Sequence, residues 1–468
     1  MPSFLIPRSA GFVALLLLAA ISSSRASAQA TTATPVTAPA SAATTDWLNF
    51  GAAPAPLAPA PKGTLWGQEL LKYTPAPLDQ GHIIFNQRLR YESVDQTGLD
   101  NAKELSLRTR VGYETPHYYG IYGVGEFENT WDINDGSAGK FPAPLNNGKA
   151  VIADPRNNEI TQLFAGYSAY QSDVKFGRQV ILLDNQRFVG PVDWRQNDQT
   201  FDALRFSTQA IKDLWLSYAW NWKVNRISGT STPTAILSRY NANNQLFNIH
   251  YTGLPKYGTL GAYVYDLDLR GATAPRVTTP VLTQTLSGET MGVFFDGKYA
   301  LNPDWSLIYR AEYAFQTDNH GTGPGSFWDN YYHFRLGGSY QKFEAGGAFE
   351  SLGGNGTHAF QTPLATLHAF NGWADQFLTT PATGLRDYYL WEKAPLPLNA
   401  NLSLEQHYYT GVVSDQTFGY EADFAVSRKF GENTTALVKF AQYRGNGAPN
   451  TGVRANVSKF WLQVEFSL

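Results

Sequence analysis

The sequence contains no cysteine, which excludes disulfide bonds and thiolate metal sites. Beyond residue 30 it also lacks any apolar run of about 18 residues, the length that a membrane-spanning helix needs. Charged residues make up only 16% of the chain, and the formal net charge of -3 provides no basic surface for nucleic acid. Disulfide-stapled domains, bundles of membrane-spanning helices and nucleic-acid-binding proteins are therefore excluded.

The abundant residues suit β-strands, since aromatic side chains make up 14% of the chain. The clearest strand covers residues 453–468, where apolar and polar side chains alternate with a period of two. Its apolar face carries Phe460, Leu462, Val464, Phe466 and Leu468. Its polar face carries Lys459, Gln463, Glu465 and Ser467.

A chain that ends on such a strand, after hundreds of residues of similar alternation, leaves an edge of unpaired backbone groups. Pairing of this edge with the first strand closes the sheet into a barrel. Lipid on the apolar face and water on the polar face then make a membrane-spanning barrel. The sequence therefore predicts an all-β fold, a transmembrane antiparallel β-barrel of about 18 strands in the outer membrane of a Gram-negative bacterium.

The segments that show this alternation number eighteen and begin at residue 82. They cover residues 82–93, 103–114, 118–132, 159–170, 173–181, 200–209, 213–226, 245–252, 257–269, 288–299, 304–316, 327–341, 343–352, 384–392, 399–410, 417–430, 433–443 and 451–468. Connections after even-numbered segments are short and turn-like, whereas those after odd-numbered segments are often long. This asymmetry is typical of periplasmic turns and external loops. Trp215, Trp220, Trp222, Tyr263, Tyr265, Trp305, Tyr309 and Tyr313 are expected largely on the lipid face.

The chain before the barrel divides into two parts. Arg8 precedes an apolar run at residues 10–21, and small residues follow, so residues 1–30 are predicted to be a cleaved secretory signal peptide. Residues 31–80 form a Pro/Ala-rich periplasmic segment, which is either a plug or a loosely ordered tail. Its small apolar content favours the tail. Residues 81–468 form the outer-membrane barrel.

Arginines gather on the inner face of the first two segments, with Arg88 and Arg90 on the first and Arg108 and Arg110 on the second, along with inward acids such as Glu92 and Glu104. Eighteen strands enclose a lumen too wide for side chains to fill, which indicates an aqueous channel. Most inward charges are interpreted as a ladder of ion pairs in which neighbouring strands carry opposite charges. The arginines are the best candidates for a local charge filter.

Two stretches resemble the alginate-export family of outer-membrane β-barrel porins. The first carries FGRQ at 176–179, RFVGP at 187–191 and WR at 194–195, and the second carries AFQTP at 359–363, LHAFNGWAD at 367–375 and GLRD at 384–387. The resemblance implies an eighteen-stranded pore through which an anionic exopolysaccharide leaves the cell, guided by arginines at an electropositive constriction. On that basis Arg178, Arg187, Arg195 and Arg386 join the substrate-pathway candidates.

The second stretch lies in a long connection, residues 353–383, which the sequence leaves ambiguous. With Trp373 and Asp375, two further substrate-pathway candidates, it forms either a constriction with a carbohydrate-stacking surface inside the lumen or an ordinary packed external loop.

Catalysis is not expected. The histidines are scattered without a nucleophile motif or zinc-type spacing. Asp132, Asn134 and Asp135 resemble a fragment of a calcium loop, but the glutamate that would complete it is missing. No enzyme activity, cofactor or metal site is therefore predicted.

Three functions remain open. The first is an export pore for an alginate-like acidic polysaccharide, the second a substrate-selective uptake porin for small sugars or organic anions, and the third a structural or adhesion barrel with a plugged lumen. The expected partners are the anionic polysaccharide or small anionic solute, outer-membrane lipid and periplasmic export proteins, with no nucleic acid.

Overall fold

A computed structural model describes residues 80–134, 148–229, 238–270, 273–274, 284–318, 327–413, 415–446 and 455–468. All of them belong to one compact unit that covers Pro35–Leu468. The predicted signal peptide and residues 31–79 of the predicted N-terminal segment lie outside the described residues. Within the described part, no helix has the length and apolarity needed to cross a membrane.

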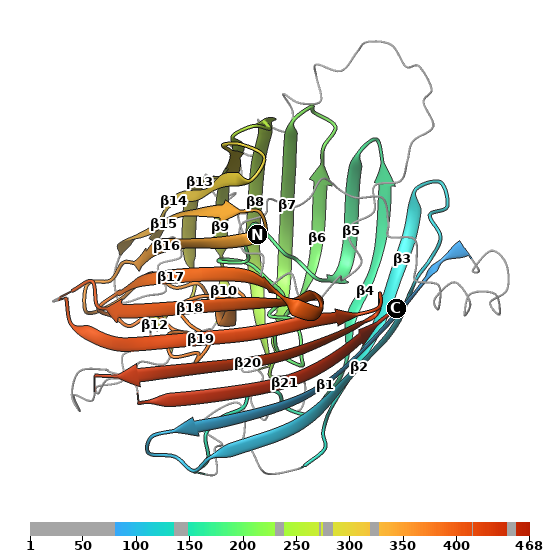
Figure 1. Cartoon of the computed structure of the whole chain (residues 1–468). Helices are drawn as coiled ribbons and strands as arrows, with labels where there is room; N and C mark the ends of the chain where they lie inside the picture. The colour runs from blue at the N-terminus through green and yellow to red at the C-terminus, as the bar shows by residue number, and fades with distance from the viewer. Residues whose placement is uncertain are drawn as a thin grey trace, which may run out of the picture. The chain divides into compact units, whose positions relative to one another are not determined.

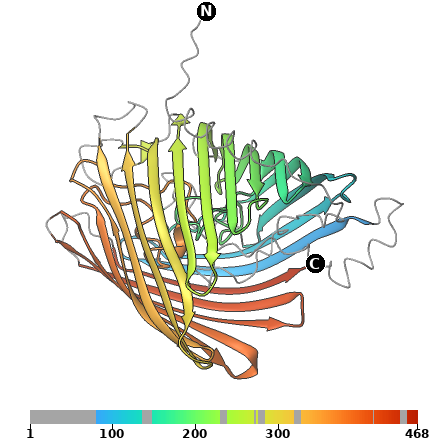
Figure 2. The same cartoon turned by 90° about the horizontal axis from the view of Figure 1, so that it is seen from above.

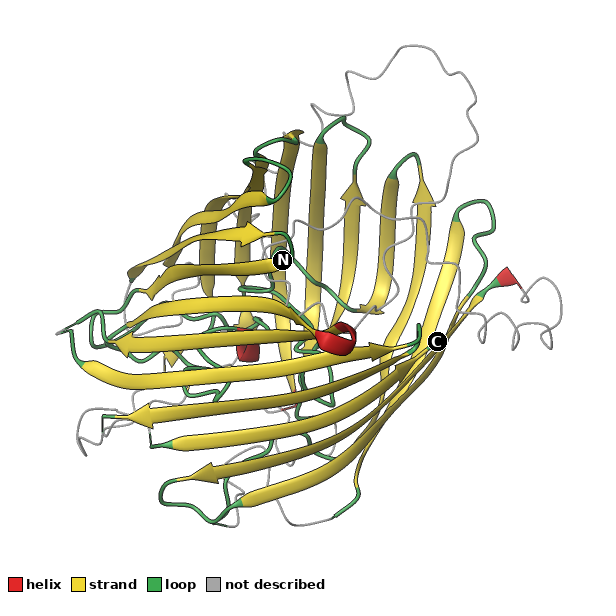
Figure 3. Ribbon diagram, in the orientation of Figure 1, coloured by secondary structure: helices red, strands yellow, loops and turns green. Residues whose placement is uncertain are grey.

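Almost every described element is a strand (Figure 3), and each long strand pairs antiparallel with the next along the chain. Eighteen long strands form the barrel: β1 (His82–Gln96), β2 (Ala102–Glu114), β3 (Ile121–Asp132), β4 (Asn157–Ala169), β5 (Ser172–Gln179), β6 (Thr200–Thr208), β7 (Leu214–Asn225), β8 (Arg239–Leu254), β9 (Gly258–Leu267), β13 (Gly288–Ala300), β14 (Trp305–Thr317), β15 (Trp328–Tyr340), β16 (Phe343–Leu352), β17 (Leu385–Leu396), β18 (Ala400–Thr410), β19 (Thr417–Phe430), β20 (Thr434–Gly445) and β21 (Val457–Ser467). The short elements are β10 (Leu269–Arg270), β11 (Thr273–Ala274), β12 (Gln284–Thr285), η3 (Leu367–Ala369) and η4 (Pro397–Asn399).

The first and last strands close the sheet. β1 pairs antiparallel with β21 from Asn86 opposite Ser467 to Gln96 opposite Val457. The two strands lie side by side in both views of the barrel (Figures 1 and 2). The predicted closed barrel is therefore confirmed, and the predicted strand segments agree with it to within a few residues. The two largest differences are six residues each: β21 begins later than predicted, at Val457, and β8 begins earlier, at Arg239, because its extension pairs with β7 and β10.

Side chains alternate across the wall of the barrel. On β21, Leu462 and Val464 are exposed on the outer face, whereas Gln463 and Glu465 are buried on the inner face. The expected outward position of Tyr263 and Tyr265 is wrong, since both are 2% exposed and pack against Phe188 inside the barrel. Alternation alone leaves the direction of β9 undecided because both of its faces carry apolar side chains.

Connections differ at the two ends of the strands, as predicted. The turn between β4 and β5 consists of Tyr170 and Gln171, whose φ angles of 50° and 57° are those of a tight hairpin turn. At the opposite end, the connections include residues 180–199 between β5 and β6 and residues 353–384 between β16 and β17. These two connections, called loop A and loop B below, carry many of the candidate residues.

Candidate functional site

Loops A and B pair with each other inside the barrel. Val189 and Leu364 form a parallel β-bridge, and the Gly190 N–H donates to the Leu364 carbonyl at 2.9 Å. The Thr366 N–H donates to the carbonyl of Gln186 at 3.1 Å. Phe360, Leu364 and other apolar side chains of the two loops are fully buried. The two loops therefore pack together as one body and are not two separate external loops.

This body is held by carboxylates on the inner face of the wall. In loop B, the Trp373 N–H donates to Asp423 Oδ2 at 3.0 Å, and the Ala374 N–H donates to Glu421 Oε1 at 2.5 Å. Because both acceptors are inward side chains of β19, loop B lies in the lumen. The structure thus resolves the ambiguity in the sequence in favour of the inward position.

The arginines of the first two strands stand directly beside each other. The register of β1 and β2 places Arg88 opposite Arg108 and Glu92 opposite Glu104. The expectation that neighbouring strands carry opposite charges is therefore wrong for this pair of strands. Like charges in directly opposite positions destabilise a sheet, so each group needs a partner from elsewhere.

The next strands on either side supply partners for the arginines. Glu465 of β21 binds both Arg88, at 3.0 Å, and Arg108, at 3.1 Å. Glu128 of β3 binds Arg110 at 2.5 Å. Because these pairs are almost completely buried, they are screened little by solvent. The arginines are consequently held in fixed positions along the inner wall.

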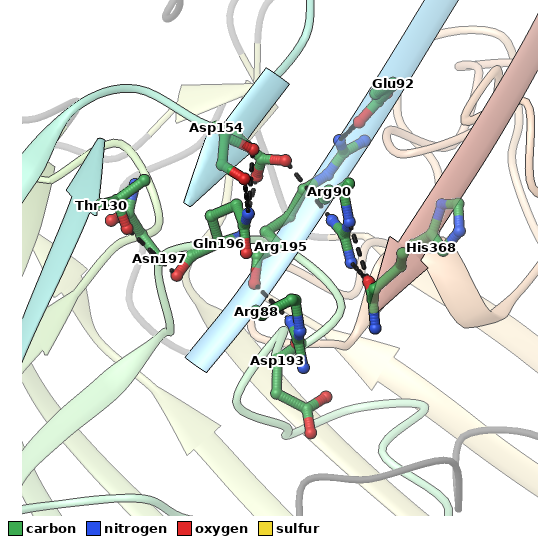
Figure 4. A network of polar contacts seen from close by, with 12 residues as sticks. Arg88, Arg90, Glu92, Thr130, Asp154, Asp193, Arg195, Gln196, Asn197 and His368 are labelled. Carbon is green, nitrogen blue, oxygen red and sulfur yellow. Dashed lines mark hydrogen bonds and ion pairs between the residues drawn. The ribbon is translucent and has the colours of Figure 1, made fainter. Parts of the chain in front are cut away.

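Loop A completes the pairing from the centre of the barrel (Figure 4). The Arg88 guanidinium donates to the carbonyl of Asp193 at 2.8 Å, and Arg195 reaches Glu92 at 3.2 Å. Asp154, from the connection between β3 and β4, lies 3.4 Å from Arg90 and accepts the Gln196 N–H at 2.8 Å. Asp198 pairs with Arg110 at 2.6 Å. Loop A therefore bridges the charged groups of β1 and β2.

Asp375 of loop B joins the two loops to the closing strand. Its carboxylate contacts Arg195 at 2.7 Å, Lys459 of β21 at 2.6 Å and His368 at 2.7 Å. Burial by itself would raise the pKa of Asp375, but the three neighbouring donors hold that pKa well below its usual range. The ionised carboxylate is therefore the centre around which two cations of different elements are fixed.

His368 is a neutral link in the same network. Burial lowers the pKa of His368 well below its ordinary value, and the ammonium group of Lys439, 2.8 Å from Nε2, lowers it further. With Nε2 accepting from Lys439, Nδ1 carries the proton and donates to Asp375. The imidazole stacks on Trp194 with ring centroids 4.5 Å apart. Loops A and B thus share an aromatic contact next to their charges.

The remaining loop candidates lie in the same body. Arg187 donates to Glu350 of β16 at 2.7 Å and packs over the ring of Phe370 at 4.8 Å. Trp373 is 1% exposed and lies under the ammonium group of Lys439 at 3.7 Å. Both side chains therefore fix loops A and B to the wall, and neither ring nor guanidinium is exposed to solvent.

Arg178 and Arg386 do not join this network. Arg178 stands opposite Leu163, which is exposed on the outer face, and pairs with Asp202 at 2.8 Å. Arg386 lies on the outward side of β17 and pairs with the exposed Asp415. The structure therefore places two of the ten sequence candidates on the outside of the wall. It brings the other eight together inside the barrel: Arg88, Arg90, Arg108, Arg110, Arg187, Arg195, Trp373 and Asp375.

Sequence reasoning missed Lys439 and Asp154. Lys439 is fully buried beneath Trp194, Trp373 and Trp461. Its inward position could have been inferred from the alternation of residues 436–443, but its aromatic neighbours come from distant segments. Asp154 lies outside any strand, so no periodicity marks it.

The charge of the site also differs from the expectation. The resemblance implied an electropositive constriction, whereas carboxylates neighbour all of the inward arginines of β1 and β2. Within the described residues, Nε and Nη1 of Arg108 make no hydrogen bond. The site is therefore a nearly balanced array of charges in which one guanidinium retains unused donors.

Comparisons with known proteins agree with this architecture. A model of the family described as "Alginate export" matches residues 112–343. Among solved structures, the outer membrane protein opdK from Pseudomonas aeruginosa is 11% identical, with a TM-score of 0.61, and the alignment covers 82% of this chain and 98% of that one. Pseudomonas aeruginosa OpdK with vanillate gives 12% identity, a TM-score of 0.63 and coverages of 84% and 99%.

Acinetobacter baumannii OccAB2 gives 12% identity, a TM-score of 0.64 and the same coverages of 84% and 99%. No protein in a search of curated proteins matches. Identities this low show a shared fold alone, and the family match concerns channel proteins rather than enzymes. The barrel and the family match together support an outer-membrane channel. The chain therefore matches the alginate-export family over residues 112–343 and has the fold of an outer-membrane β-barrel protein of Gram-negative bacteria.

Proposed function

We propose that this channel exports an anionic, uronate-type exopolysaccharide through its lumen. The observation that carries the proposal is the column of four inward arginines on β1 and β2, one of which, Arg108, retains unused donors. Guanidinium groups bind carboxylates in a bidentate geometry, and a uronate polymer presents one carboxylate on each sugar. The family match supports the same class of substrate.

The array of paired charges suits a moving anion. A guanidinium without any partner in a low-dielectric site would be costly, and it would also hold a polymer too tightly. Here the wall carboxylates, such as Glu465 and Glu128, occupy the arginines when the substrate is absent. A substrate carboxylate that exchanges with them leaves no arginine unpaired at any step. Conduction requires binding that is favourable and still reversible.

A second candidate is the uptake of small organic anions. The observation that favours it is the body formed by loops A and B, which lies across the lumen and contacts both β19 and β1. A polymer needs those contacts to open, whereas a small anion needs less space. The structurally similar OpdK was crystallised with vanillate, a small carboxylate.

Single-channel recording in planar bilayers tests the anionic pathway. We expect the reversal potential in a salt gradient to show preference for anions, because low-dielectric walls focus the local field of the arginines. Arg108→Ser together with Arg110→Ser should weaken this preference and raise the uronate concentration needed for block. Arg178→Ser is the matched control, since Arg178 lies on the outer face. Cation preference in the wild type, or equal effects of the two changes, would refute the anionic pathway.

The length of the blocking oligomer separates the two candidates. Export of a polymer predicts that block by uronate oligomers strengthens with each added sugar, because successive carboxylates occupy successive arginines. Uptake of small anions predicts that a monomeric uronate blocks as well as a longer oligomer. The heat-modifiable mobility of each variant on gels confirms that the barrel is assembled before recording.

A further inference from the structure

Three metal-ligating side chains converge on the inner face of β18 and β19, next to loop B. Glu405 and His407 alternate on β18, and the register places Asp423 of β19 directly opposite Glu405. His407 Nε2 is 3.5 Å from Glu405 Oε2 and 3.8 Å from Asp423 Oδ2. One ligand atom from each side chain lies within 4.8 Å of the others. The strand register therefore creates a compact group of one imidazole and two carboxylates.

Two polar atoms of this group are buried without a hydrogen bond. The His407 side chain is only 2% exposed, yet its Nε2 makes no hydrogen bond with any described residue, and neither does Asp423 Oδ1. The two separations from Nε2 exceed the 2.7–3.2 Å range of ordinary N–H···O bonds, about 0.3 Å or more beyond its upper limit. Directly opposite carboxylates also repel each other. A buried nitrogen without a hydrogen bond thus lies within 3.8 Å of two carboxylates.

The opposite side of the imidazole is already oriented for metal binding. Asp387 of β17 contacts His407 Nδ1 through both carboxylate oxygens, at 2.9 Å and 3.0 Å. This carboxylate–imidazole contact occupies Nδ1 and turns Nε2 toward Glu405 and Asp423. Histidines that bind metals commonly have such a partner on their second nitrogen.

We infer that Glu405, His407 and Asp423 form a binding site for a divalent transition-metal ion of the zinc type. Ligand atoms about 2.0–2.2 Å from a tetrahedral zinc ion lie roughly 3.4 Å apart, close to the two separations of Nε2. Nitrogen and carboxylate ligands suit zinc better than calcium, which prefers oxygen alone. Three protein ligands leave a fourth position for water or a substrate carboxylate.

The site is coupled to loop B through Asp423. Its Oδ2 accepts the Trp373 N–H of loop B at 3.0 Å. A metal ion bound by Asp423 would therefore share this carboxylate with loop B. Glu421, the next inward residue of β19, is occupied by the Ala374 N–H at 2.5 Å and the Tyr409 hydroxyl at 3.4 Å. It belongs to the docking of loop B rather than to the ligand set.

Zinc binding to the full-length mature protein in detergent, stripped with EDTA and dialysed, tests the inference. We expect one zinc ion per chain by atomic absorption, and a visible Co²⁺ spectrum typical of a low-coordinate N/O site when cobalt replaces zinc. His407→Gln should weaken zinc binding at least 100-fold. Asp387→Asn should weaken it about 10- to 100-fold, as loss of an outer-shell partner does.

His250→Gln is the matched control, because His250 is also buried on the inner face and pairs with Asp184 at 2.5 Å. It should retain wild-type zinc affinity. If His407→Gln does not assemble, Glu405→Gln, at a half-buried position, provides the same comparison. A wild-type protein that binds no zinc, or variants of Glu405 and His407 that bind it as tightly as the wild type, would overturn the inference. The group would then be a protonated histidine among acids.

Discussion

At the scale of single residues, the lumen depends on a few groups that serve several partners. Asp375 neutralises Arg195 and Lys459 while it accepts a hydrogen bond from His368. The left-handed backbone of Asp375, with φ of 59°, turns this carboxylate into the network. None of this can be read from periodicity, because the partners lie on loop A, loop B and the last strand.

A pH dependence follows for His368. Because its pKa is lowered in the folded protein, the unfolded chain binds the additional proton as the pH falls below the ordinary value of about 6.5. The contribution of neutral His368 to stability is therefore present above that pH and is lost below it. We expect the free energy of unfolding in urea, measured in detergent, to fall between pH 7.5 and pH 5. His368→Gln should remove this component of the slope, and a variant that keeps the whole slope would assign it to other groups.

At the scale of elements, the strands could be predicted and the loops could not. Alternation identified all eighteen strands, because one face of each meets lipid and the other meets polar groups. Alternation within a strand does not show which residues of the neighbouring strand lie opposite, so the pairing of Arg88 with Arg108 was not predicted. Loop B was left ambiguous since its contacts with β19 and β21 join residues more than forty positions apart.

Asp375→Asn tests how loop B is held. The substitution keeps the shape of the side chain but leaves two buried cations without their shared anion, which costs about 3–5 kcal/mol when a buried pair loses one member. We expect chymotrypsin to cleave within residues 353–384, which include Phe370 and Phe377, much faster than in the wild type, while the barrel remains heat-modifiable. Asp415→Asn removes the exposed partner of Arg386 and should change cleavage little, in line with the small energies of exposed pairs. Equal resistance of both variants would show that Asp375 does not dock the loop.

At the scale of the whole molecule, closure of the barrel is also the step that balances its charges. The two arginines that face each other on β1 and β2 share Glu465, which lies on β21 near the C-terminus. Closure brings together Arg88 and Glu465, which are 377 positions apart in the sequence. Contacts between residues this distant in sequence form slowly during folding.

Glu465→Gln should therefore slow closure. The variant removes the anion shared by Arg88 and Arg108, so the final pairing of strands gains less energy. We expect the heat-modifiable band to appear several-fold more slowly during folding into lipid vesicles. Glu344→Gln, which affects the half-exposed pair with Lys298, serves as the control and should fold at the wild-type rate. Equal folding rates for the wild type and both variants would show that the charge of Glu465 does not speed closure of the barrel.

The opposition of Arg88 and Arg108 has a further consequence during biogenesis. Before β21 arrives, the hairpin of β1 and β2 presents an open backbone edge, and such edges readily pair with the wrong strand. An incoming strand without an acid at the position of Glu465 would leave two buried guanidinium groups uncompensated, at a cost of several kcal/mol. The charges of this hairpin therefore favour pairing with the chain's own last strand over pairing with a strand that lacks an acid at this position.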